Sequence, residues 1–219
     1  MTTLGTLLPG EIKSHIFPFP EGILTSVNTD RVELFASLLA LIALGGSVLY
    51  AVMARWPVGS SEQGPSGRAQ LRSDIVDDVR RLSLWLAWVV AAVSTAGSLY
   101  FSEVANYVPC QLCWYQRIAM YPLAGVLLVA AIRKDWSARW YCLPMLITGV
   151  GVSAYHYFIE WKPAFGESAC SVGPACTDIW FRRLGFVTLA FMALSGFIAI
   201  LLLLFVQPNR ARQSSSSET

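Results

Sequence analysis

Long apolar segments bounded by charged residues restrict the fold of this chain more than any other feature of its sequence. A helix that spans a bilayer needs about 20 consecutive apolar residues. Four segments reach that length between flanking charges, and they cover residues 34–53, 82–102, 140–159 and 184–206. A fifth, residues 118–132, reaches it if its helix begins near Cys113 and Arg117 lies just inside the boundary or snorkels. We therefore predict an all-α membrane protein with five spanning helices.

Charged residues are scarce and are gathered into a few short runs. They make up 14% of the chain against 55% hydrophobic residues, whereas a soluble domain usually carries about a quarter charged residues. The net charge of +2 and the lack of a basic stripe or nucleic-acid motif argue against a nucleic-acid partner. No Asp, Glu or Lys lies in the middle of a predicted span, which argues against an ion or proton pathway.

A linker rich in Pro, Gly and Ser, residues 57–70, separates the first span from the other four. We therefore predict a four-helix transmembrane bundle with one additional N-terminal transmembrane helix. The predicted units are an extracytoplasmic tail, the additional helix, a cytoplasmic linker, the four-helix core and a disordered cytoplasmic tail, at residues 1–30, 31–55, 56–80, 81–207 and 208–219. Leu71, Ile75 and Val79 recur every four residues, which indicates either an amphipathic helix on the inner surface or the start of the next span.

The distribution of basic residues predicts which side of the membrane each loop faces. Residues 55–81, the short turn 133–139 and the C-terminal tail fall on one side of a five-span chain, and together they carry ten of its sixteen Lys and Arg residues. The positive-inside rule makes that side cytoplasmic. The loops at 103–117 and 160–183, which carry cysteines, are then expected to face outward.

Four of the five cysteines form two pairs, one in each outward loop. Cys110 and Cys113 make a C-x-x-C motif, and Cys170 and Cys176 make a C-x5-C motif. The fifth, Cys142, lies inside a span and is expected to be a small buried hydrophobic residue. Disulfides are common outside the cytoplasm, so the four outward cysteines can simply form structural disulfides. A zinc site is disfavoured because the five-residue gap fits zinc spacing poorly and an oxidising space disfavours four free thiolates, so we expect no metal.

The two pairs differ in what a disulfide would contribute. A turn at Gly173-Pro174 can bring the second pair together, which fits a structural bridge. A C-x-x-C bridge closes a very small loop and contributes little loop entropy, so its value is chemical: such thiols often have lowered pKa values and exchange readily.

The surroundings of the C-x-x-C motif favour redox chemistry. Pro109 precedes it and a span begins just after it, which places Cys113 in the first turn of a helix, where backbone N–H groups favour a thiolate. Arg117 follows one turn later on the same face. Its guanidinium can stabilise a thiolate or hold the carbonyl oxygen of a ligand in the bilayer, and the alternative is an interfacial arginine that snorkels.

The motif PCQLCWYQR, followed by a span and a second pair of loop cysteines, resembles the disulfide-bond formation protein B (DsbB) family, in particular its short, BdbC-like branch. The segments MYP at 120–122 and AYHY at 154–157 are similar to that branch as well. The resemblance covers about residues 80–207. The first span and the N-terminal tail lie outside it, and the second cysteine pair is more closely spaced than in the longer branch of the family.

The resemblance implies an enzyme of the cell membrane, a protein-disulfide:quinone oxidoreductase. Such enzymes oxidise a thioredoxin-fold, DsbA-like partner outside the cytoplasm and pass the electrons to a membrane quinone, either ubiquinone or menaquinone. By position, Cys170 would form the mixed disulfide with the partner and Cys176 would then exchange with Cys110. Cys113 would be the thiolate next to the quinone, and Arg117 matches the quinone-associated arginine of the family.

His156 is a second ionisable residue near the outer boundary. Ionisable residues inside a membrane are candidates for function, so His156 can donate a proton or a hydrogen bond to the quinone. The alternative is a hydrogen-bonded interfacial histidine within the aromatic belt that Tyr155 and Tyr157 form.

Two other functions fit parts of the sequence. A vitamin K epoxide reductase-like enzyme also combines four spans, loop cysteines and a quinone, but its C-x-x-C lies in the last core span, and 184–206 contains no cysteine here. A non-enzymatic membrane protein with two structural disulfides is the second alternative, and its bridges would resist mild reductants.

Overall fold

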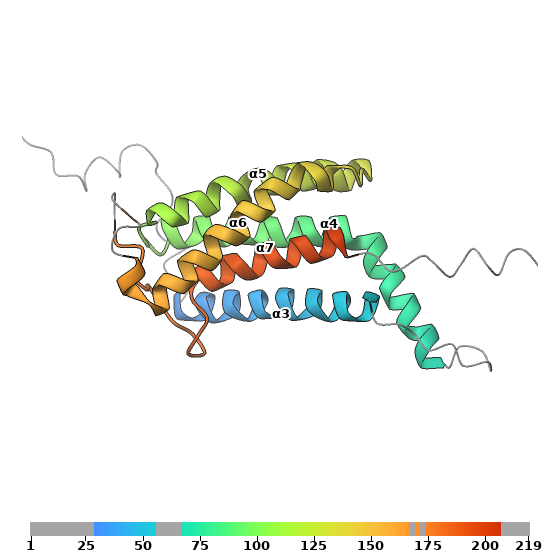
Figure 1. The fold of residues 1–219 in the computed structure, drawn as a ribbon, viewed down its shortest axis with the longest axis horizontal. Coiled ribbons are helices and arrows are strands. Elements are labelled where there is room, and N and C mark those ends of the chain that lie inside the picture. Colours follow the sequence, from blue (N-terminus) through green and yellow to red (C-terminus); the bar gives the residue numbers. More distant parts are fainter. Residues whose placement is uncertain (1–28, 56–66, 167–169, 171–173, 207–219) are drawn as a thin grey trace, which may run out of the picture.

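A computed structural model describes residues 29–55, 67–166, 170 and 174–206 of the chain. The predicted C-terminal tail, 208–219, lies outside these residues, and so does the predicted N-terminal tail, 1–30, apart from Thr29 and Asp30. The elements, in chain order, are the helices α3 (Thr29–Arg55), α4 (Gly67–Glu103), α5 (Gln111–Arg133) and α6 (Ala138–Trp161), a 3-10 turn η1 (Pro163–Phe165), and α7 (Leu189–Phe205). The long helices run side by side along one axis of the molecule (Figure 1). The predicted all-α membrane bundle is confirmed, and α3, α4, α5 and α6 contain stretches long and apolar enough to span a bilayer.

The last helix is shorter than its apolar sequence predicted. The apolar segment starts at Leu184, but α7 begins only at Leu189 and has 17 residues, about 25 Å at 1.5 Å per residue, which is the lower end of spanning lengths. The reason is a tight turn before it. Leu184 and Gly185 have positive φ angles of 52° and 80°, and Arg183 pairs with Val187 in an isolated bridge. The hydroxyl of Thr188 then caps α7 by accepting the N–H of Phe191.

Helix α4 is longer than predicted and includes the run with apolar residues at every fourth position. Residues 67–103 form one helix of 37 residues, so this run is continuous with the span. Leu71 and Ile75 are exposed, whereas Val76 is buried. The first part of α4 diverges from the other helices (Figure 1), and its place on the inner membrane surface stays a prediction.

The bundle is organised around α7. This helix packs along α3, α4 and α6, and α5 lies against α4 and α6. Phe197 on α7 is fully buried and fills the space left by the missing side chain of Gly149 on α6. The predicted architecture is therefore confirmed: α4 to α7 form a four-helix unit, and α3 adds a fifth helix to it.

Both cysteine-bearing loops lie at the same end of the bundle, on the left in Figure 1. The basic turn 133–139 lies at the opposite end, as the alternation of antiparallel helices requires. This end-to-end separation is what the positive-inside argument assumed. The side of the membrane that each end faces stays a prediction.

Candidate redox site

The C-x-x-C motif forms the start of α5. The helix begins at Gln111, directly after Pro109 and Cys110, so Cys113 lies in the first turn as predicted. Cys110 is the N-cap residue, and its Sγ accepts a hydrogen bond from the backbone N–H of Cys113 at 3.3 Å. This backbone N–H therefore stabilises a thiolate on Cys110. The sequence had instead suggested that the N-terminus of the helix would stabilise a thiolate on Cys113.

The two sulfur atoms of this motif are close enough to exchange a bond. Both cysteines are free thiols, and their Sγ atoms lie 2.7 Å apart, compared with about 2.05 Å in a disulfide. With His156 they form a group of possible metal ligands whose atoms lie within 4.8 Å of one another. Two thiolates on one tetrahedral zinc lie about 3.7 Å apart, given Zn–S bonds of about 2.3 Å. The shorter separation favours a redox pair over a metal site.

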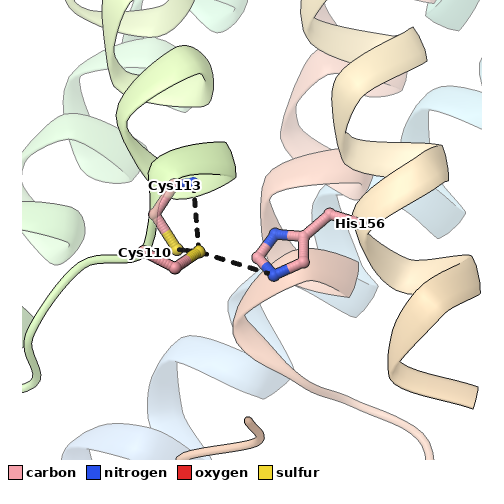
Figure 2. Close-up of side chains that lie close together, drawn as sticks. All are labelled: Cys110, Cys113 and His156. Atoms are coloured by element: carbon pink, nitrogen blue, oxygen red, sulfur yellow. Dashed lines mark hydrogen bonds between the residues drawn. The ribbon is translucent and has the colours of Figure 1, made fainter. Parts of the chain in front are cut away.

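His156 reaches from α6 toward the sulfur of Cys110 (Figure 2). Its Nε2 lies 3.8 Å from that sulfur, and its Nδ1 lies 3.1 Å from Nε2 of Gln116. Because the Gln116 amide nitrogen donates, Nδ1 accepts and the proton of the neutral ring is on Nε2, facing the sulfur.

Cys110 lies just outside the spanning helix α5, and its neighbours change the acidity of its thiol. The hydrogen bond to Cys113 lowers the pKa of the Cys110 thiol, burial opposes this, and His156 lowers that pKa further.

Replacing His156 by phenylalanine is expected to shift the ionisation of Cys110 to higher pH. A hydrogen bond to a charged group contributes about 1.5–3 kcal/mol, so losing it should raise the pKa of this thiol by about one unit or more. The measurement is the pH profile of thiolate absorbance in the reduced protein, taken as the difference from Cys110→Ser. Tyr155→Phe, an exposed neighbour on α6, serves as the control. An unchanged profile in His156→Phe would show that the imidazole does not act on this sulfur.

The second cysteine pair forms a disulfide and lies in one apolar cluster with the C-x-x-C motif. Cys170 and Cys176 form a disulfide with their Cα atoms 5.9 Å apart. Cys176 is 1% exposed. It belongs to one hydrophobic cluster with Cys110, and the partly buried Cys113 and Cys170 pack against that cluster. The fold therefore brings all four loop cysteines together, although more than fifty residues separate the two pairs in the sequence.

One polar contact and an aromatic stack hold the loop that contains Cys176. The buried Glu160, at the end of α6, accepts a hydrogen bond from the hydroxyl of Thr188 at 2.6 Å. Trp180 stacks on Tyr107 with ring centroids 4.8 Å apart. Because Tyr107 lies three residues before Cys110, this stack ties the two cysteine-bearing loops to each other.

An apolar cavity of about 580 Å³ adjoins the C-x-x-C motif. Helices α3, α4, α5 and α7 all contribute to its wall, and Cys113, Gln116 and Arg117 line it from α5. The Arg117 Nη2 donates to the backbone oxygen of Ser98 at 3.1 Å, and its guanidinium carbon lies 5.2 Å from the ring centre of Trp114. Cys113 and Arg117 therefore face one cavity, as their four-residue spacing predicted. His156 is not among the residues that line it and contacts Cys110 instead.

Known proteins with similar sequences share this part of the chain. The family model described as "Disulfide bond formation protein DsbB" matches residues 80–207. The chain belongs to the DsbB family. It is 43% identical to "Disulfide bond formation protein C" of Bacillus subtilis over 124 residues, which are 56% of this chain and 90% of the relative. It is 47% identical to "Probable disulfide formation protein" of Oceanobacillus iheyensis, over 55% of this chain and 84% of the relative. None of the solved structures matches the chain significantly.

The DsbB match covers the four-helix unit, apart from the first part of α4, and every candidate site residue that the sequence analysis named. Residues 80–207 include the four loop cysteines, Arg117 and His156, whereas α3 lies before the matched segment. With its apolar helices and this family membership, the protein is a multi-pass membrane disulfide oxidoreductase. The predicted family is confirmed.

The structure also brings to the site residues that the sequence analysis did not single out. Gln116 orients the His156 ring, and its signal was a polar amide within an otherwise apolar helix, directly before Arg117. Glu160 marks the end of a span in the sequence, but nothing in the sequence indicated that it is buried and bonded to Thr188. That contact depends on the turn before α7, which brings Thr188 to α6.

Proposed function

We propose that this protein reoxidises a thioredoxin-fold, DsbA-like partner and passes the electrons to a membrane quinone. In this proposal it acts in the cell membrane, with its cysteine loops on the extracytoplasmic side. One observation carries the proposal. The four loop cysteines share one cluster, and one of them, Cys113, also lines an apolar cavity with Arg117. The site thus connects a disulfide in a loop with a space suited to a lipid-soluble acceptor.

The residues of the cavity fit a quinone. Its volume of about 580 Å³ lies within the ~300–1,000 Å³ of small-molecule sites, which combine apolar walls with a few polar groups. Arg117 supplies charged donors beside Cys113. The hydroxyl of Tyr100, another lining residue, is buried and has no hydrogen-bond partner within the described part of the chain. A quinone carbonyl oxygen would give these donors an acceptor.

In the proposed relay, each step exchanges one thiolate for another. A partner thiolate attacks Cys170, a mixed disulfide forms, and Cys176 leaves as a thiolate. The second partner thiol then attacks its own mixed disulfide, which releases Cys170 and leaves the partner oxidised. Cys176 attacks Cys110 of a closed Cys110–Cys113 disulfide and frees the Cys113 thiolate, and Cys170 then closes on Cys176 and frees Cys110. Two electrons and two protons have now moved from the partner to the C-x-x-C motif.

The remaining step returns Cys110 and Cys113 to a disulfide. A quinone, when bound, supplies an acceptor for two electrons and two protons. The protein places Cys113 and Arg117 in the wall of the same cavity, and in this proposal the Arg117 guanidinium stabilises the negative charge that develops there. His156 holds a proton on Nε2 next to Cys110 and stabilises the thiolate of Cys110 each time it forms.

The test is turnover in detergent with a reduced thioredoxin-fold oxidase from the same genome and a soluble quinone analogue. We expect prompt loss of quinone absorbance, and we expect Cys170→Ser to abolish it, because serine cannot form the mixed disulfide. Continued turnover in Cys170→Ser would contradict the partner-facing role of that cysteine. If the wild-type protein reduced no quinone with a competent partner, two structural disulfides would become the better explanation.

A further inference from the structure

The additional helix α3 lies outside the DsbB match, yet it forms one wall of the cavity. Seven of its residues between Val32 and Ala43 line the cavity, opposite the wall that carries Cys113 and Arg117. These residues belong to the half of α3 that lies at the cysteine-loop end of the bundle (Figure 1). The chamber next to the redox motif is therefore completed by a helix that the matched family core does not contain.

Helix α3 is anchored to both cysteine-bearing loops. The buried carboxylate of Glu33 accepts hydrogen bonds from the hydroxyl of Tyr107 at 2.5 Å and from Nε of Arg183 at 2.8 Å. Arg183 also pairs with Asp30. Burial, together with the bond to Glu33, raises the pKa of Tyr107 to about 12, so this hydroxyl remains a donor at physiological pH. The N-terminal end of α3 therefore has a fixed position relative to the redox motif.

The cavity has an open rim between α3 and α4. Helix α3 packs extensively on α7 and much less on α4. Phe35 and Ile42 line the cavity from α3 but remain 63% and 68% exposed, and Val89 and Val93 on α4 line it while 45% and 48% exposed. Side chains that line a cavity and also keep about half of their surface accessible lie at its rim. All four are apolar and lie within membrane-spanning helices, so this rim faces lipid.

We propose that α3 and α4 form a lateral portal through which the hydrocarbon tail of a bound quinone passes from the cavity into the bilayer. This inference rests on the proposed quinone function and adds to it the route of the tail. The headgroup lies at the wall formed by Cys113 and Arg117. The tail leaves the cavity between the rim residues of α3 and those of α4. Ala36, Ala40 and Ala43 repeat at helical spacing on the lining face of α3 and set the width of the passage.

The test narrows this passage and compares two quinones with one headgroup, one long-tailed and one without a tail. Ala40→Phe places a ring in the passage. The matched control is Gly46→Phe, which adds a ring on the same helix at a position that does not line the cavity, where a new Cβ meets nothing within 4 Å. Equilibrium binding is measured by quenching of tryptophan fluorescence in the purified full-length protein, and quinone KM and kcat are measured with the reduced partner.

We expect Ala40→Phe to raise the Kd and KM of the long-tailed quinone about tenfold and to leave kcat and the binding of the tail-less quinone within about twofold. Gly46→Phe should change neither. Ala43→Leu, a smaller addition on the same face, should give a weaker effect of the same kind and stands in if Ala40→Phe does not fold. Equal losses for both quinones, or no loss for either, would overturn the portal. If the wild-type protein bound neither quinone, the proposed function would fail as well.

Discussion

Serine in place of Cys113 is expected to stop quinone reduction while leaving the bundle folded. Cys113 is the cysteine that joins the two parts of the site, because its sulfur lies 2.7 Å from that of Cys110 and it also lines the cavity. A serine oxygen cannot take part in disulfide exchange. We expect turnover with a reduced thioredoxin-fold partner to fall by about 10³-fold or more, to the uncatalysed rate, because residues that act as a unit lose nearly all activity together.

Cys142→Ser is the matched control for this substitution. Cys142 is a free cysteine, buried in the main core of the bundle rather than in the cluster that holds the loop cysteines. We expect this variant to lose some stability and to retain its turnover per folded molecule. Near-wild-type turnover in Cys113→Ser would contradict the relay. Equal loss of turnover in both variants at equal folded fraction would show that the effect is structural.

The Cys113→Ser variant also shows where electrons stop. In the proposed order, the partner can still reduce the Cys170–Cys176 disulfide, because that exchange does not use Cys113. Trapping with an alkylating reagent should therefore find Cys170 and Cys176 reduced and Cys110 unable to form its intramolecular bridge. If the Cys170–Cys176 bridge stayed closed in the presence of a reduced partner, the partner would not enter the relay through that pair.

The helices and the meeting of the two cysteine pairs follow from the sequence for simple reasons. Each span is a long apolar run between charges, and loops of antiparallel helices alternate between the two ends of a bundle. The pairs therefore had to share one end, and the four-residue spacing of Cys113 and Arg117 placed both on one face of α5. These properties depend on helical periodicity and chain direction, which sequence patterns report directly.

The contacts that complete the site depend on how helices pack, and short sequence patterns do not report this. Glu33 meets Tyr107 across 74 positions and Arg183 across 150. In the sequence, Glu33 was only an acidic residue near the start of a span. Likewise, the start of α7 at Leu189 depends on the turn at Leu184 and Gly185, although the apolar run continues through it. The part played by α3 in the cavity became visible only once its place beside α7 and α4 was known.

Replacing Arg117 by methionine is expected to give the second largest loss of quinone reduction. Methionine keeps much of the apolar length of the side chain but removes its charge and donors, so the cavity keeps its shape. Removing one preorganised donor from a site where charge develops lowers kcat by about 10²–10³-fold, and we expect that range here. Exchange between the partner and the Cys170–Cys176 bridge should be unaffected, because Arg117 faces the cavity.

Arg139→Met is a matched control because Arg139 makes the same kind of contact at the opposite end of the bundle. Its guanidinium carbon lies 5.3 Å from the ring centre of Trp140, compared with 5.2 Å between Arg117 and Trp114. Both substitutions therefore remove one positive charge and one arginine–tryptophan contact. Turnover is measured with the soluble quinone analogue, and the melting temperature of each variant is measured in the same detergent.

Arg117→Lys separates charge from geometry. Lysine keeps the positive charge but not the planar fork of donors, so a role in stabilising charge alone predicts a loss of about tenfold or less, well short of the methionine variant. A loss as large as that of Arg117→Met would mean that the directed N–H groups of the guanidinium, rather than its charge alone, provide most of the stabilisation. If Arg117→Met turned over like Arg139→Met, the arginine would only snorkel at the membrane boundary, and the cavity would hold its acceptor without it.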